Sequence, residues 1–186
     1  MTTLARRSPL GAIRGDVQSA RVIQQDGLTV RELPFGVHRI LRFERAAVTV
    51  SDAPLPERIN RAVVGAYGLL AWVGPDEWWL WSGDRSSGDD PFARVPQVDV
   101  SHGHTALEVS GEGARSVLAR GIPLDLHPRA FGAGFATRTH VDHAPVLMIH
   151  TDADSTFYLV VRRSFAHYLW QWLEMAAERR NFAPIP

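Results

Sequence analysis

The chain contains no cysteine and no lysine among its 186 residues, and these two absences exclude several kinds of chemistry. Without cysteine, the chain has no thiolate nucleophile, no disulfide and no thiolate metal site. Without lysine, it has neither a Schiff base nor the ammonium group of a phosphate-binding loop. Its 20 basic residues, all arginine, balance 20 acidic residues, so the formal net charge is zero. Because a neutral chain is not drawn to nucleic acid or to an acidic membrane surface, we expect neither as a partner.

Long apolar runs are also missing. The longest nearly uncharged stretch, residues 62–73, is far shorter than the roughly 20 residues that a membrane-spanning helix needs. Residues 1–15 contain arginines but no apolar segment before a small-residue cleavage site, so no secretory signal is predicted and we expect a cytoplasmic protein. The composition is that of an ordinary globular chain. We predict an N-terminal arm at residues 1–20 and a single domain at residues 21–186.

Apolar and polar residues alternate in short runs, which predicts an α+β fold built mainly from antiparallel sheets with packed helices. Eight strands are predicted, at residues 28–33, 37–43, 69–73, 77–82, 98–101, 105–109, 145–150 and 157–161. Turn-forming residues separate consecutive strands, so we expect the strands to pair two by two in this order.

Three helices are predicted from the spacing of apolar residues, at residues 56–66, 110–120 and 165–177. Pro56 stands at the favoured first position of the first helix, and Gly121 follows the end of the second. Strands and helices then follow one another in the same order in both parts of the chain, which suggests two pseudo-repeated halves. A stretch rich in Ser, Gly and Asp marks an internal boundary between them near residues 83–96.

The tryptophans are more numerous than one core face needs. Trp78 in the predicted hairpin points to one face of its strand, and Trp79 and Trp81 point to the other. In the last helix the apolar stripe is predicted to run through Phe165, Tyr168, Leu169, Trp172, Met175 and Ala176. Trp170 falls nearly opposite this stripe and is expected outside the chain's own core. We therefore predict that Trp79, Trp81 and Trp170 form an interface with a partner protein.

Two patterns are typical of metal or cofactor binding. His102 and His104 have the spacing of ligands on one strand face, but Gly103 between them predicts a turn, so we predict no metal site. The run 110–114 carries two glycines before a predicted helix, as dinucleotide-binding loops do. The third glycine of that fingerprint is replaced by Ser116, so we predict no cofactor site either.

The acidic residues likewise form no recognisable catalytic set. Asp152 and Asp154 resemble the opening of a calcium loop, but the later Gly and Glu are missing and the pattern predicts a hairpin turn. Asp99 and Asp125 are the first carboxylates to test for catalysis, although a strand end and a loop explain them more simply. No nucleophile elbow or zinc-protease helix is present, so we predict no catalytic residue.

Several motifs in this order resemble those of the gamma subunit family of heterotetrameric sarcosine oxidase, over nearly the whole chain. They are Arg7-Ser8-Pro9-Leu10, Gly74-Pro75-Asp76-Glu77-Trp78, Val98-Asp99-Val100-Ser101, the run Gly121 to Phe131, and Val160-Val161-Arg162-Arg163-Ser164-Phe165. Residues 97–118 are also similar to the opening of the folate-binding aminomethyltransferase fold of the glycine cleavage T protein. That fold is therefore the expected architecture.

The resemblance implies a non-catalytic subunit that assembles with a large alpha flavoprotein subunit and with beta and delta subunits. Such a complex demethylates sarcosine oxidatively to glycine, producing hydrogen peroxide and formaldehyde or methylenetetrahydrofolate. The resemblance places FAD, FMN, NAD, tetrahydrofolate and zinc on the other subunits and none in this chain. Two alternatives stay open: a freestanding folate-binding protein of the aminomethyltransferase type, and the equivalent subunit of a complex that oxidises another N-methyl amino acid.

Overall fold

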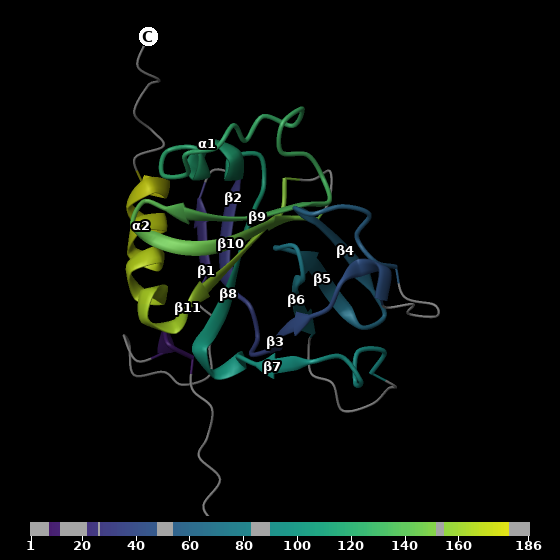
Figure 1. Ribbon diagram of the computed structural model, residues 1–186. Helices are drawn as coiled ribbons and strands as arrows, with labels where there is room; N and C mark the ends of the chain where they lie inside the picture. The colour runs from purple at the N-terminus through teal and green to yellow at the C-terminus, as the bar shows by residue number, and fades with distance from the viewer. Residues whose placement is uncertain are drawn as a thin grey trace, which may run out of the picture.

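The computed structural model describes residues 8–11, 22–25, 27–47, 54–82, 90–151 and 155–178. Within these ranges, eleven strands form one sheet and two α-helices pack beside it (Figure 1). The strands are β1 (Val22–Gln25), β2 (Leu28–Glu32), β3 (Val37–Arg42), β4 (Arg61–Gly65), β5 (Gly68–Trp72), β6 (Glu77–Ser82), β7 (Gln97–Asp99), β8 (His104–Ser110), β9 (Phe135–Val141), β10 (Ala144–His150) and β11 (Phe157–Arg162). The helices are α1 (Ala114–Leu118) and α2 (Ala166–Glu178), and the 3-10 turns are η2 (Arg45–Ala47), η3 (Ser101–Gly103) and η4 (Arg163–Phe165).

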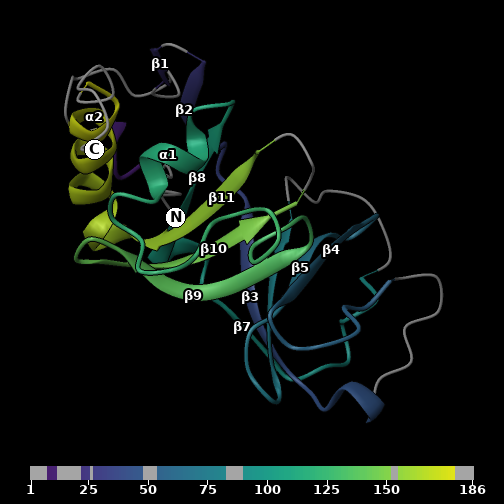
Figure 2. The same ribbon diagram turned by 90° about the horizontal axis from the view of Figure 1, so that it is seen from above.

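All strand pairs of the sheet are antiparallel, and the order is β1-β2-β8-β11-β10-β9-β4-β5-β6-β3-β7. The chain crosses between the two parts of the sheet twice, from β2 to β3 and from β7 to β8. The second crossover contacts the start of β3, because the Val100 N–H donates to the His38 carbonyl oxygen at 2.9 Å. Figure 2 shows the resulting curvature, with β9, β10 and β11 curving beside the part that contains β3 to β7.

Helices α1 and α2 cover one face of the part formed by β1, β2, β8, β11, β10 and β9 (Figure 1). The buried side chains between them form the helix-covered cluster: Leu10, Leu28, Val30, Leu107, Val109, Ala114, Val117, Leu118, Ile122, Leu126, Phe131, Val141, Ala144, Val146, Met148, Phe157, Leu159, Val161, Ala166, Leu169, Trp170, Leu173, Ala176 and Ala177. Most of its members are aliphatic, as expected for a helix layer on a sheet.

The other face of these strands packs against the β4–β6 strands. This central cluster consists of Leu33, Ala62, Leu69, Ala71, Trp79, Ala106, Ala136, Leu147, Ile149 and Val160. A third group, the loop-covered cluster, lies on the outer face of β3, β5 and β6 and consists of Leu41, Phe43, Tyr67, Leu70, Trp78, Leu80 and Phe92. Both faces of β6 are therefore buried, which confirms the predicted division between Trp78 and the pair Trp79 and Trp81.

Several predicted elements are confirmed. Strands β5 and β6 form the predicted hairpin, and β10 pairs with β11 as predicted. Helix α2 begins one residue after the predicted start and ends one residue after the predicted end. In the part of the chain that the structure describes, no helix is long and apolar enough to cross a membrane.

Two predicted strand pairings are wrong. Strands β2 and β3 do not pair with each other: β2 pairs with β1 and β8, and β3 pairs with β6 and β7. Strand β7 likewise pairs with β3 and not with β8. The reason is that the segments between these strands are crossovers and not hairpin turns. Local turn residues indicated where the strands end, but they carried no information about the long-range partner.

The predicted helix at residues 56–66 is also wrong. Residues 57–60 form a turn, and Arg61–Gly65 is strand β4. The adjacent β-branched residues Val63 and Val64 favour a strand, and Gly65 pairs with Gly68 to close a hairpin with β5. Gly68 has a φ of 110°, and its backbone approaches the Trp81 carbonyl oxygen so closely that no side chain fits there.

Trp170 lies inside the core, so the expectation that it stands outside is wrong. Its residue is 2% exposed, whereas Met175 on the predicted stripe is 50% exposed. The buried face of α2 is displaced by one residue, about 100° around the helix, because small residues such as Ala166 and Ala177 allow close approach to the sheet. The indole N–H of Trp170 donates to Glu174 Oε1 at 2.6 Å, so the ring is buried without leaving this donor unpaired.

The predicted repeat is not confirmed, and the predicted boundaries stay a prediction. Among the described residues the first half contains a turn and strand β4 where a helix was predicted, so the predicted order of elements does not recur. Part of the predicted internal boundary, residues 83–89, lies outside the described residues, as does most of the predicted N-terminal arm. Within that arm, residues 8–11 are described and Leu10 is fully buried in the helix-covered cluster.

Candidate functional site

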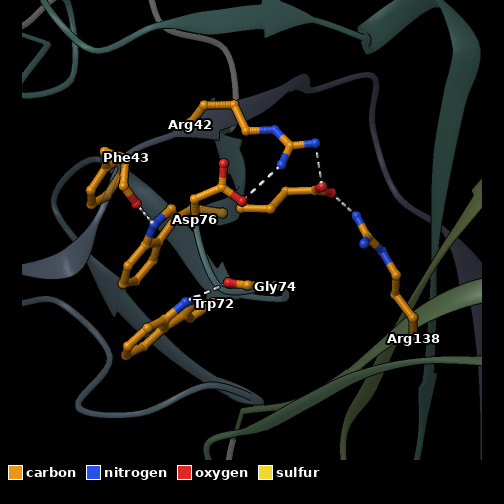
Figure 3. A network of polar contacts seen from close by, with 8 residues as sticks. Arg42, Phe43, Trp72, Gly74, Asp76 and Arg138 are labelled. Carbon is orange, nitrogen blue, oxygen red and sulfur yellow. Dashed lines mark hydrogen bonds and ion pairs between the residues drawn. The ribbon is translucent and has the colours of Figure 1, made fainter.

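The motif Gly74 to Trp78 forms the turn between β5 and β6 and the start of β6 (Figure 3). Glu77, whose side chain is 13% exposed, accepts from two arginines that lie on other strands. Arg42 Nη2 on β3 is 2.7 Å from Glu77 Oε2, and Arg138 on β9 is hydrogen-bonded to Glu77 Oε1. Arg42 also contacts Asp76 Oδ1 at 3.0 Å. The motif therefore connects β6 to β3 and to β9 through ion pairs.

Two indoles complete the same turn. Trp72 Nε1 donates to the Gly74 carbonyl oxygen at 2.6 Å, and Trp78 Nε1 donates to the Phe43 carbonyl oxygen at 2.9 Å (Figure 3). The Trp78 ring stacks between Trp72 and Phe43, with ring centroids 4.6 Å away on each side. These contacts order the turn and the loop-covered cluster below it.

The motif Val98 to Ser101 closes the second crossover. The Ser101 hydroxyl donates to Asp99 Oδ1 at 2.5 Å and accepts from the His38 backbone N–H at 2.9 Å. The Ser101 N–H also donates to Asp99 Oδ1, at 2.8 Å. Asp99, one of the two carboxylates singled out for catalysis, thus caps the 3-10 turn η3, which leads from β7 into β8 and is hydrogen-bonded to β3 through His38.

His38 lies beneath this crossover and is 3% exposed. Burial lowers the pKa of His38 to about 4, with His104 adding a smaller repulsion, so the ring is neutral at pH 7. Its Nδ1 accepts from Trp79 Nε1 at 3.4 Å. Burial also lowers the pKa of His104, whose ring packs edge-on against Trp79 with centroids 4.8 Å apart. Both imidazoles therefore belong to an aromatic core.

The motif Gly121 to Phe131 is a loop organised around one arginine. Arg115 of α1 donates through Nη1 to the carbonyl oxygens of Leu126 and Phe131, the latter at 3.1 Å. Asp125, the other singled-out carboxylate, accepts the His127 N–H at 2.9 Å. Gly121 is in contact with the Trp172 ring, which occupies the space of a side chain at that position. The loop is thereby fixed against α1 and α2.

Ser8 to Leu10, the described part of the motif nearest the N-terminus, also connects segments that are distant in sequence. Ser8 Oγ donates to Glu32 Oε1 at 2.5 Å and accepts from the Leu10 N–H at 2.9 Å. The fully buried Leu10 then anchors the segment in the helix-covered cluster. In each of these four motifs, the polar side chains close turns or connect segments that are distant in sequence.

The three tryptophans predicted as an interface do not share one exposed surface. Trp170 is buried in the helix-covered cluster and Trp79, 5% exposed, is buried in the central cluster. Trp81 is partly exposed at the rim of the central cluster. The structure thus separates Trp170 from the other two, and only Trp81 keeps an appreciable exposed surface.

The residues weighed for metal and cofactor binding are also placed. In the described ranges, no three His, Asp or Glu side chains come close enough together to hold a metal ion. His102 is exposed and contacts the Phe35 ring, whereas His104 points to Trp79. Gly111, in the glycine-containing loop, has a φ of 99° and packs against the Gly27 carbonyl oxygen, which explains its identity by packing. Residues 152–154 lie outside the described residues.

Comparison with known proteins matches this chain to one family. A sequence model of the family described as "Sarcosine oxidase, gamma subunit family" matches residues 45–179, more than two thirds of the chain. This chain belongs to the sarcosine oxidase gamma subunit family. The family resemblance derived from the motifs is therefore confirmed.

Individual gamma subunits agree over most of the chain. The sarcosine oxidase subunit gamma of Corynebacterium sp. (strain P-1) is 30% identical, and that of Corynebacterium sp. (strain U-96) is 28% identical, each over 99% of this chain and 96% of the relative. That of Arthrobacter sp is 33% identical over 64% of this chain and 62% of the relative. A chain of the heterotetrameric sarcosine oxidase from Corynebacterium sp. U-96, solved in complex with pyrrole 2-carboxylate, superposes with a TM-score of 0.78 at 26% identity. The superposition covers 97% of this chain and 99% of that one.

The network of Glu77 with Arg42 and Arg138 is the main feature that sequence reasoning missed. Strand β9, which carries Arg138, was not predicted. Its sequence nevertheless places residue types that favour strands at every second position, Phe135, Thr137, Thr139 and Val141, and Asp142, a residue type common in hairpin turns, follows. That alternation was a usable signal for the strand. Nothing in the sequence indicated that β9 would face Glu77, 61 residues away.

Proposed function

We propose that this chain is the gamma subunit of a heterotetrameric sarcosine oxidase and that it docks on the large alpha subunit without contributing a catalytic group. The observation that carries the proposal is the superposition along nearly the full length of a chain from such a complex. The complex would demethylate sarcosine to glycine, with hydrogen peroxide and formaldehyde or methylenetetrahydrofolate as products. FAD, FMN, NAD, tetrahydrofolate and zinc would be held by the alpha, beta and delta subunits.

The contacts of the family motifs support a structural role. Asp99, Asp125 and Glu77 each accept hydrogen bonds or ion pairs that close turns or join strands. A general acid or base has to reach a substrate proton, and a carboxylate already engaged in this way is poorly placed for that role. Of the three tryptophans predicted as an interface, Trp81 keeps that role as a prediction, because it has an exposed side.

The test is co-purification followed by activity measurement. The tagged chain should be expressed with the alpha, beta and delta subunits encoded in the same genome, and the purified complex assayed for oxygen consumption with sarcosine. We expect a stoichiometric complex that oxidises sarcosine, and no turnover by the chain alone. Failure to co-purify, or turnover of sarcosine by the isolated chain, would contradict the proposal.

Two controls separate the alternatives. Titration of the isolated chain with tetrahydrofolate tests the freestanding folate-binding protein, for which we expect saturable binding at about micromolar concentration. The same titration addresses the proposed likeness to the folate-binding aminomethyltransferase fold. Replacing sarcosine by other N-methyl amino acids in the oxygen assay tests whether the complex prefers a different substrate.

A further inference from the structure

Among the described residues, strand β9 has one fully paired edge and one edge that is largely open. It pairs with β10 along its whole length, but with β4 only where Phe135 faces Arg61. One more hydrogen bond follows, from the Ala136 N–H to the Asn60 carbonyl oxygen at 3.1 Å. Asn60 has a φ of 62°, so the chain turns away from β9 at that residue. Figure 2 shows β9 separating from β4 and curving toward α2.

The backbone groups of Arg138 and His140 point to this open edge. In an antiparallel pair, residues alternate between positions that bond to the partner strand and positions that bond outward. The Ala136 N–H bonds outward. Pro145 on β10, which has no N–H, faces His140 on β9. Arg138 and His140 have the same parity as Ala136. Among the described residues, no backbone hydrogen bond uses either N–H.

The surroundings of the open edge are basic. Arg58 lies in the turn at residues 57–60 that precedes β4. Burial together with the charge of Arg58 lowers the pKa of Arg61. Neither arginine has an ion pair with a described acid, and Arg61 instead packs on the Phe135 ring, 3.3 Å from its centroid. Arg138, in contrast, is paired with Glu77 (Figure 3). The exposed Glu57 forms no ion pair with either arginine among the described residues.

An exposed apolar side chain lies beside these charges. Ile59, in the same turn as Arg58, is 43% exposed. An open strand edge, two guanidinium groups without an ion pair to a described acid, and an exposed aliphatic side chain are the elements that bind an added strand. Main-chain hydrogen bonds supply affinity, and side-chain contacts on the flanking surface select the sequence.

We propose that the open edge of β9 binds an extended, acidic segment of the alpha subunit, which adds to the sheet as a further strand. This proposal rests on the proposed function, because it names the surface through which the chain docks. The segment would bond to the backbone of Arg138 and His140 and place a carboxylate near Arg58 and Arg61. A second copy of this chain is a poor occupant, because edge-to-edge pairing would bring the basic surroundings of two copies together.

Hydrogen exchange on the intact complex tests the main-chain part. In the assembled enzyme we expect the amides of Arg138 and His140 to exchange at least about tenfold more slowly than in the isolated chain. The amide of Gln24 on β1 is the internal control. By the same alternation, counted from the Gln25–Leu28 pair, it points outward at the far edge of the sheet. Fast exchange of Arg138 and His140 in an intact complex would overturn the proposal.

Paired variants test the assembly itself. His140→Pro removes the outward N–H and places a ring at the edge, while the β9–β10 hydrogen bonds remain, because proline is tolerated at such a position. We expect it to weaken co-purification with the alpha subunit about tenfold or more, whereas Gln24→Pro at the other edge leaves assembly unchanged. Equal assembly of the two variants would contradict the proposal.

A charge reversal covers the case in which His140→Pro does not fold. Arg58→Glu changes one exposed residue, and we expect at least about fivefold weaker assembly, with a smaller effect at high salt. Its matched control is Arg94→Glu, an exposed arginine in the loop of the loop-covered cluster, which should assemble normally. If Arg58→Glu and Arg94→Glu assemble equally well and are equally active, the proposal that the bound segment is acidic is contradicted.

The outcomes separate this proposal from the proposed function. If the wild-type chain forms no complex with the alpha subunit, the proposed function itself fails. If the complex forms but the β9 amides exchange freely and the variants assemble normally, only the strand-addition proposal fails. A dimer of the isolated chain that His140→Pro disrupts, measured by light scattering, would favour self-pairing and overturn the proposed occupant.

Discussion

The helix-covered and loop-covered clusters stabilise their parts of the sheet in different ways. The helix-covered cluster is mostly aliphatic, with three aromatic residues among its 24 described members, and two helices close it. The loop-covered cluster has four aromatic residues among seven and is closed by loops. Ion pairs and indole hydrogen bonds around Gly74 to Trp78 compensate for the missing helix layer.

The difference explains why the family motifs lie where they do. A helix packed on a sheet is stabilised by many interchangeable apolar contacts, so few individual residues are indispensable. A loop that covers a sheet face has to satisfy its own backbone groups, and specific partners such as Trp78 Nε1 and Arg115 do this. The family motifs described above are concentrated at loops and turns for this reason.

The largest effect is expected at Trp170 in the helix-covered cluster. Trp170→Ala should lower the free energy of unfolding by about 3–5 kcal/mol, because it removes a buried indole and leaves a cavity under α2. Urea unfolding measures this. Met175→Ala on the exposed side of the same helix should cost less than about 0.5 kcal/mol. Comparable losses in the two variants would contradict the assignment of the buried face.

The second prediction concerns His38, at the crossover between the two regions. Its pKa is about 4 in the folded protein and 6.5 when unfolded, so the unfolded chain binds the extra proton between these values. The contribution of His38 to stability is therefore complete above about pH 6.5 and is lost as the pH drops toward 4, by up to about 3 kcal/mol. Urea unfolding from pH 7 to pH 4 should show this slope, and His38→Asn should reduce it. An unchanged slope in the variant would assign the acid sensitivity to other groups.

The smallest effect is expected at Glu77. Glu77→Gln removes the charge that pairs with Arg42 and Arg138, whose side chains are each 51% exposed, so solvent already weakens both pairs. We expect a loss of about 1–2 kcal/mol, most of it suppressed in high salt. Glu112→Gln, at an exposed site outside this network, is the control and should be neutral. A loss as large as that of Trp170→Ala would show that ion pairs stabilise the loop-covered region as strongly as helix packing stabilises the other.

The elements that could be predicted are those determined locally. Glu77 to Ser82 and Phe157 to Arg162 are confirmed as strands because alternation and nearby turn residues specify them. The 56–66 helix failed because Pro56 and a short apolar spacing are equally compatible with a turn followed by a strand. The pairing of β2 with β8 was beyond reach, since it joins segments more than 70 residues apart.

The candidate site shows the same division. Motifs in the sequence identified the family, and the comparisons confirm it. The burial of Trp170 was mispredicted because the periodicity of α2 fits two neighbouring stripes, and only the small size of Ala166 and Ala177 favours the correct one. The open edge of β9 depends on a left-handed conformation at Asn60, which no apolar pattern indicates.

The order of strands in the sheet has a consequence for synthesis on the ribosome. The β5–β6 hairpin and its pairing with β3 can form once residue 82 has emerged, since all three strands are then available. Strand β2 must wait for β8, and β4 must wait for β9, before either gains its second neighbour. The nascent chain therefore exposes an aromatic hairpin early while its partners are still being translated, which is the period in which a chaperone has most to protect.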